Sequence, residues 1–194
     1  MQSQSIIQQA LGEQWQQLPP ALQAHYMPHT NKDIGTLDIE YPQFMQRYLN
    51  LIFRFGALFN RCGKNIPTVV QKRMDGKTQH WKRTIRFQAD KEIIFQSRWE
   101  YAGSNELIEY VNRFMGLRMA VNVKQGKLYY RGISLILKIG PFRIPIPEWL
   151  LLGHTTIVET AIDENHFAMD FKLHHPFFGM IYRYSGIFRT EIIN

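Results

Sequence analysis

Arg83 and Ser97 are the residues whose positions point most directly to chemistry. Both fall on apolar faces of predicted β-strands within residues 66–101. A buried charge needs a partner, because removing an isolated charge from water is very costly. Glu159, on a later predicted strand, is the candidate partner for Arg83. One interpretation is a structural ion pair, and the other is an anchor for the acidic head of an apolar ligand.

The ligand hypothesis places aromatic side chains around Arg83. Small-molecule sites are typically concave and apolar, with a few polar groups that orient the ligand. The candidate ligand-binding residues are Arg83, Ser97, Glu159, Tyr182, Tyr184 and Trp81.

The excess positive charge of the chain is concentrated in residues 61–91. This stretch has nine Lys/Arg residues and two acidic residues. A patch of this kind attracts phosphates of lipids, nucleotides or nucleic acids, whereas the simpler alternative is a solvated strand face. The candidate basic surface consists of Arg73, Lys82, Arg86 and His80. Nucleic acid is not expected as a partner, because the nearby aromatic residues point inward, where bases cannot stack on them.

The strongest local indication of secondary structure is for a β-hairpin within residues 66–88. Asp75-Gly76 lies between two runs of β-forming residues, and this dipeptide favours a two-residue turn. Such a turn pairs Met74 with Lys77 and Val70 with Trp81. Alternation then predicts an inward face with Val70 and Trp81, and a solvated outward face.

The helical signals are concentrated in the first third of the chain. Residues 3–18 and 20–26 have helical spacing, so we divide a single domain, 1–194, into an N-terminal helical segment, 1–34, and a β-rich body, 35–194. Residues 42–60 predict one amphipathic helix with a wide apolar stripe. Such a stripe packs on the sheet or lies on a membrane surface.

The remaining chain predicts about ten strands joined by short connections. We therefore expect a mainly β (α+β) fold, an antiparallel up-and-down meander that closes into a lipocalin-like barrel or half-barrel. The N-terminal helices and helix 42–60 pack on or in it. A helix-grip lipid-binding fold is the alternative, although that fold normally ends in a long helix and this chain ends in a predicted strand.

Searches for established chemical motifs are negative. The sequence has no glycine-rich phosphate loop, nucleophile elbow or dinucleotide fingerprint, and its histidines lack metal-site spacing. We therefore expect no catalytic residues, no metal and no cofactor. With a single cysteine, Cys62, no signal peptide and no long apolar run, we expect a cytoplasmic protein.

Several short motifs resemble those of a known bacterial family. They are 18–22 (LPPAL), 81–85 (WKRTI), 95–97 (FQS), 126–128 (GKL), 144–147 (IPIP), 166–170 (HFAMD), 176–179 (PFFG) and 184–186 (YSG). Over roughly residues 11–190 the chain resembles the family catalogued as domain of unknown function 4166. Members of that family occur alone or fused to saccharopine-dehydrogenase-like reductases. The resemblance implies an accessory or substrate-holding role beside a reductase-type partner, and it supplies no active-site residues.

Three functional hypotheses follow. The first is a module that binds an apolar or amphipathic anion, such as an acyl compound, inside the barrel. The second is an accessory domain that binds an anionic membrane or a protein through the basic hairpin 66–88. The third is an enzyme with Glu159 or Asp170 as acid or base, and the sequence favours a binding module over it.

Overall fold

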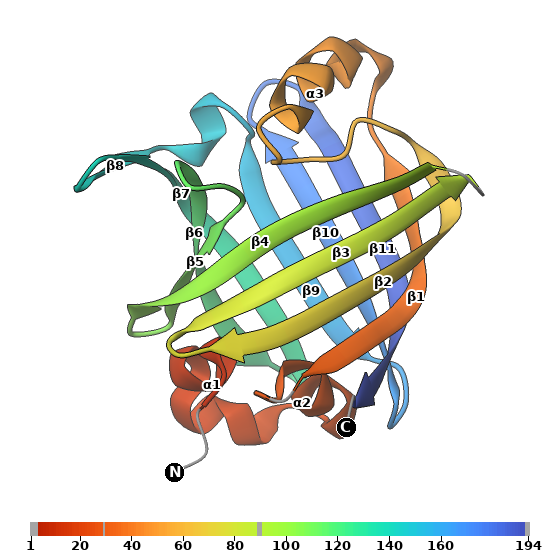
Figure 1. Cartoon of the computed structure of the whole chain (residues 1–194), viewed down its shortest axis with the longest axis vertical. Coiled ribbons are helices and arrows are strands. Elements are labelled where there is room, and N and C mark those ends of the chain that lie inside the picture. The colour runs from red at the N-terminus through yellow and green to blue at the C-terminus, as the bar shows by residue number, and fades with distance from the viewer. Residues whose placement is uncertain (1–3, 29, 89–90, 193–194) are drawn as a thin grey trace.

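The protein is built around one antiparallel β-sheet (Figure 1). The computed structural model describes residues 4–28, 30–88 and 91–192. Its strands are β1 (Asn31–Glu40), β2 (Gly63–Asp75), β3 (Thr78–Gln88), β4 (Lys91–Gly103), β5 (Glu106–Tyr110), β6 (Met115–Lys124), β7 (Lys127–Ile139), β8 (Phe142–Ile146), β9 (His154–Ala161), β10 (His166–His175) and β11 (Gly179–Ile192). Its helices are α1 (Ile6–Leu11), α2 (Pro20–Tyr26) and α3 (Gln46–Phe53), with 3₁₀ turns η1 (Gly12–Gln17), η2 (Gln43–Met45) and η3 (Glu148–Leu150).

The sheet closes into a barrel of ten strands. Strands β1 to β7 pair in chain order, β9 to β11 continue the sheet, and β11 pairs with β1. The start of β7 pairs with β9, whereas its end pairs with β8, an eleventh strand outside the closed barrel. The predicted mainly β meander is therefore confirmed. The sheet closes on itself through the pairing of β11 with β1, and the longest α-helix among the described residues has only 8 residues, so the helix-grip alternative is wrong.

The two ends of the barrel are covered differently. Figure 1 shows α1 and α2 at one end, here called the floor, and α3 at the opposite end, here called the mouth. At the floor, a capping box at Ser5 starts α1, which buries Ile6 and Ile7. Gly12, with φ of 52°, ends α1, so the predicted helix 3–18 is shorter than expected and continues as η1. Strand β1 begins at Asn31, four residues before the predicted start of the β-rich body at residue 35.

The predicted helix 42–60 is wrong in length. The α-helix ends at Phe53, and Gly56 then takes a left-handed conformation, with φ of 73°. This turn sends Leu58 and Phe59 into the barrel, where both are buried. The segment therefore caps the mouth as a short helix followed by an irregular stretch, and not as one long helix. No helix in the described part of the chain is long and apolar enough to cross a membrane.

The hairpin of β2 and β3 has a register two residues away from the predicted one. Its turn residues are Gly76 and Lys77, and Gly76 has the positive φ that a type II′ turn requires at this position. Val70 consequently lies opposite Arg83, and Lys72 lies opposite Trp81. A shift of two residues preserves the faces of a strand, so the predicted inward face is correct. This inward face also includes Lys72, whose side chain is buried in the barrel interior.

Candidate functional site

The barrel interior contains two adjoining cavities of about 70 and 50 Å³. Both are lined by Phe59, Arg83, Glu109 and Tyr184, which therefore lie between them. One water molecule needs at least ~10–15 Å³ of such space, so each cavity has room for a few waters or part of a small ligand. A long acyl chain requires the lining side chains to move.

The upper cavity lies beneath the mouth and is mainly apolar. The segment after α3 contributes Leu58 and Phe59, and the loop before β9 contributes Leu152. Tyr184 stacks on Phe171 in the cavity wall, with ring centroids 4.5 Å apart. This arrangement provides a site for an apolar group close to the end of the barrel that α3 covers.

The lower cavity lies toward the floor and contains two tryptophans in contact. The rings of Trp81 and Trp99 lie 4.4 Å apart, and both side chains are buried. In the part of the chain that the structure describes, neither indole Nε1 has a hydrogen-bond partner. A buried donor without a partner costs about 1–3 kcal/mol. The lower cavity is therefore lined by two indole rings whose N–H groups are buried and have no partner among the described residues.

Arg83 is held between the cavities by a carboxylate and two aromatic rings. Its Nη1 lies 3.1 Å from Glu109 Oε1 and donates to Ser97 Oγ at 2.9 Å. Ser97 in turn donates to Glu109 at 2.6 Å, and the guanidinium lies over the rings of Trp81 and Phe95. Arg83 and Ser97, both predicted ligand-binding residues, are therefore in direct contact. The expected pairing of Arg83 with Glu159 is wrong, because Glu109 on β5 takes that place.

Glu159 instead ends a chain of tyrosine hydroxyls. Tyr130 donates to Tyr26, and the Tyr26 hydroxyl donates to both carboxylate oxygens of Glu159, at 2.8 and 2.7 Å. Burial raises the pKa of Glu159 to about 7, although the Tyr26 hydrogen bond and the ammonium of Lys72 oppose this shift. Glu159 therefore changes its charge near neutral pH inside the barrel.

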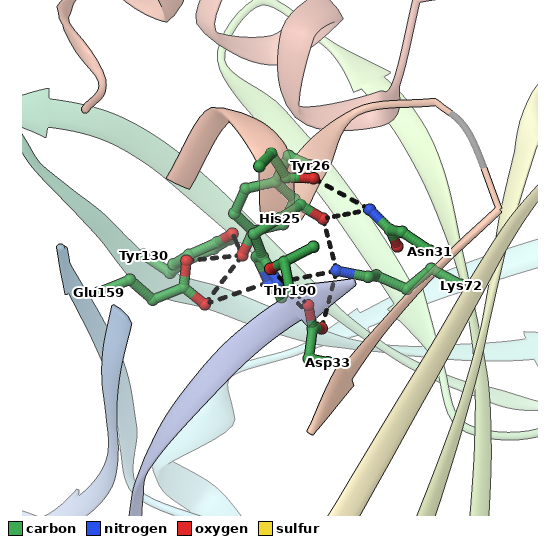
Figure 2. A network of polar contacts seen from close by, with 9 residues as sticks. His25, Tyr26, Asn31, Asp33, Lys72, Tyr130, Glu159 and Thr190 are labelled. Atoms are coloured by element: carbon green, nitrogen blue, oxygen red, sulfur yellow. Dashed lines mark hydrogen bonds and ion pairs between the residues drawn. The ribbon is translucent and has the colours of Figure 1, made fainter. Parts of the chain in front are cut away.

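A second cluster of buried polar side chains connects β1, β2 and α2 (Figure 2). Lys72 Nζ lies 2.8 Å from Asp33 Oδ2 and 2.7 Å from His25 Nδ1, and Thr190 donates to Asp33 Oδ1 at 2.8 Å. Burial would raise the pKa of Asp33, but His25 and Lys72 lower it to about 2. Burial lowers the pKa of His25 to about 4, so its ring is neutral at pH 7.

The interior charges limit which ligands fit. Each interior cation has a carboxylate partner, since Lys72 pairs with Asp33 and Arg83 with Glu109. Glu159 adds a negative charge when it is ionised. The described interior therefore carries no excess positive charge, and an anionic ligand would compete with Glu109 for Arg83. Among the described residues, no cluster of His, Cys, Asp and Glu could hold a metal ion.

Two other predicted residues, Tyr182 and Asp170, do not line the cavities. Tyr182 is buried and stacks on Tyr41, but does not line either cavity. Asp170 binds Arg183 at 2.8 Å in a partly exposed position, away from the two cavities.

The predicted basic residues lie on the outer side of β2 and β3. Arg73 lies directly opposite His80, and Lys82 lies opposite Gln71 in the same pair of strands. Arg86 is bound to Glu92 at 2.5 Å. Part of the predicted basic charge is therefore neutralised locally.

Sequence reasoning missed six residues of the interior. They are His25, Tyr26, Asp33, Lys72, Glu109 and Tyr130. The signal for Lys72 was present, because it follows Val70 at a spacing of two on the inward face. His25 and Tyr26 carried no such signal, since only the packing of α2 against the floor brings them to the strands.

Comparison with known proteins gives one match. The family model described as "Domain of unknown function (DUF4166)" matches residues 18–188. No curated protein and no solved structure matches the chain significantly.

Proposed function

For this chain, which belongs to the family of the domain of unknown function DUF4166, we propose a binding function located inside the barrel. The ligand is a small amphipathic molecule, with its polar head in the lower cavity and its apolar part in the upper cavity. The observation that carries this proposal is the pair of adjoining cavities, the lower one lined by Trp81 and Trp99, whose buried indole N–H groups have no partner among the described residues.

The head of the ligand is an oxygen acceptor. Trp81 and Trp99 supply indole N–H groups, and an acceptor bound there removes the cost of leaving buried donors unpaired. Arg83 lies at the junction of the cavities, over the Trp81 ring. Because Glu109 already neutralises Arg83, an uncharged carbonyl or hydroxyl head fits better than a carboxylate. A carboxylate head remains compatible if it displaces Glu109 or enters protonated.

The size of the cavities favours a compact ligand. Their combined space suits a short apolar chain or a ring, and a membrane-type acyl chain would have to extend through the mouth. The first experiment is native mass spectrometry of the protein purified from its host, followed by solvent extraction of bound compounds. Titrations with 1-octanol and octanoate, followed by tryptophan fluorescence, then compare neutral and anionic heads. A protein that carries nothing and responds to neither probe contradicts the proposal.

Trp81→Phe is expected to weaken binding of the extracted compound, or of 1-octanol, about fivefold. The substitution keeps a ring and removes one hydrogen-bond donor, whose net contribution is about 1 kcal/mol. Trp149→Phe at the exposed mouth is the matched control, and it should leave the dissociation constant unchanged. Equal affinities for wild type and Trp81→Phe would show that the Trp81 indole takes no part in binding. A folded Arg83→Met variant with undiminished affinity would show the same for Arg83.

An acid–base enzyme is the second candidate, and the pKa of Glu159 favours it. A buried carboxyl with a pKa of about 7 in a cavity is suited to proton transfer at neutral pH. Conversion of the extracted compound by wild type, with a pH profile that changes near 7 and disappears in Glu159→Gln, would support this function. Recovery of the unchanged compound after incubation would favour binding alone.

A further inference from the structure

Exposed hydrophobic side chains are concentrated at the mouth. Of the 18 large hydrophobic residues that are exposed in the described chain, 13 lie in four segments at this end: 41–62, 111–114, 139–153 and 174–180. Phe177 is the most exposed of them, at 81%. We call nine of these residues the mouth collar: Phe44, Leu51, Phe55, Phe114, Trp149, Leu150, Leu151, Phe177 and Phe178. Concentrated exposed apolar surface marks an interaction site.

Direct contacts join the four segments around α3. The ring of Phe44 lies 5.9 Å from that of Phe178, which links the start of the helical segment to the turn between β10 and β11. Tyr48 donates to the carbonyl of Leu151 at 2.5 Å, and Asn112 donates to the carbonyl of Phe55 at 2.7 Å. The collar is therefore one packed surface and not a set of separate loops.

The charges of the same segments are almost all positive. They contain five arginines, Arg47, Arg54, Arg61, Arg113 and Arg143, all exposed, and a single acidic residue. That residue, Glu148, is buried and accepts from the backbone N–H of Thr155 at 3.1 Å. Within the described residues, only Arg143 of the five arginines has an ion-pair partner, Glu100, at 3.7 Å. The mouth thus combines exposed apolar side chains with cations that are mostly unneutralised.

We propose that the mouth collar docks on the surface of an anionic lipid bilayer. Aromatic and leucine side chains favour the boundary between headgroups and acyl chains, and arginines beside them attract anionic headgroups. The opposite end of the barrel lacks this combination, because its described turns contribute only Ile162 to the exposed large hydrophobics. Docking at the mouth also places the upper cavity next to the membrane, although the proposal depends on the surface and not on any ligand.

Vesicle flotation with the full chain tests the proposal. We expect binding to vesicles of phosphatidylcholine with phosphatidylserine, and at least tenfold weaker binding to phosphatidylcholine alone or in 0.5 M salt. The double variant Phe177→Ser/Phe178→Ser removes exposed rings without creating a buried cavity, and it should reduce binding at least tenfold. The matched control Arg73→Gln/Lys82→Gln alters the basic hairpin surface instead, and should bind like wild type. Thermal unfolding checks that both variants fold.

Three results would overturn the proposal. One is the absence of binding to anionic vesicles at low salt. Another is binding that the hairpin variant loses and the Phe177→Ser/Phe178→Ser variant keeps, which would assign the membrane contact to β2 and β3. The third is a wild-type dimer in size-exclusion chromatography that the Phe177→Ser/Phe178→Ser variant converts to a monomer, which would assign the collar to self-association.

Discussion

Replacing Lys72 with methionine is expected to lower the free energy of unfolding by about 3–5 kcal/mol, the range observed when one partner of a buried ion pair is removed. Lys72 is only 1% exposed, and its ammonium is the nearest cation to Asp33, at 2.8 Å. Methionine has a similar length and shape, so most of the expected cost comes from the carboxylate of Asp33. That carboxylate keeps the Thr190 hydroxyl as a donor and His25 Nδ1 at 3.0 Å, but it loses its ammonium partner.

A double-mutant cycle separates this electrostatic cost from packing. Asp33→Asn removes the charge that Lys72→Met leaves uncompensated, so the double variant should be more stable than the sum of the two single changes predicts. Urea unfolding at pH 7 measures all four proteins, and Lys82→Met on the exposed side of β3 is the control for a surface lysine. Additive effects in the cycle, or a cost below ~1 kcal/mol for Lys72→Met, would contradict the buried pair.

The barrel was predictable because strand alternation and turn residues are local signals. The inward face of β2 and β3 was right even though the pairing of Val70 was assigned to Trp81 and not to Arg83, since a slip of two residues leaves every side chain on its own face. The length of helix 42–60 was not predictable in this way. The apolar residues continue past Gly56, but there the chain is no longer helical. Leu58 and Phe59 in this irregular segment are buried at the mouth.

The polar interior was only partly predictable, because charge pairs form between distant strands. The requirement that Arg83 have a carboxylate partner was correct, whereas the choice between Glu109 and Glu159 depended on which strands are neighbours. Glu109 lies on β5, which pairs with β4, and Ser97 on β4 bridges it to Arg83. The mouth collar escaped prediction for the same reason, since its residues come from four segments that only barrel closure brings together.

Glu159→Gln is expected to change how stability depends on pH. The folded pKa of Glu159 is about 7, against an ordinary value of 4.5. Its stabilising contribution is therefore complete below about pH 4.5 and is lost as the pH rises through 7. His25 acts in the opposite direction, because burial lowers its pKa from 6.5 to about 4, so its contribution grows between these two pH values. In the wild type the two effects oppose each other between about pH 4.5 and 6.5.

The variant should reveal the His25 contribution alone. Glu159→Gln keeps the size of the side chain and an oxygen that accepts from Tyr26, but removes the titration. Its stability relative to wild type should rise by about 3 kcal/mol between pH 4.5 and 8, at 1.36 kcal/mol for each unit of pKa shift. Urea unfolding across this range measures the difference, and Glu164→Gln in the exposed turn before β10 is the control. A difference that does not vary with pH would mean that the folded pKa of Glu159 is not raised, because Tyr26 and Lys72 offset the effect of burial.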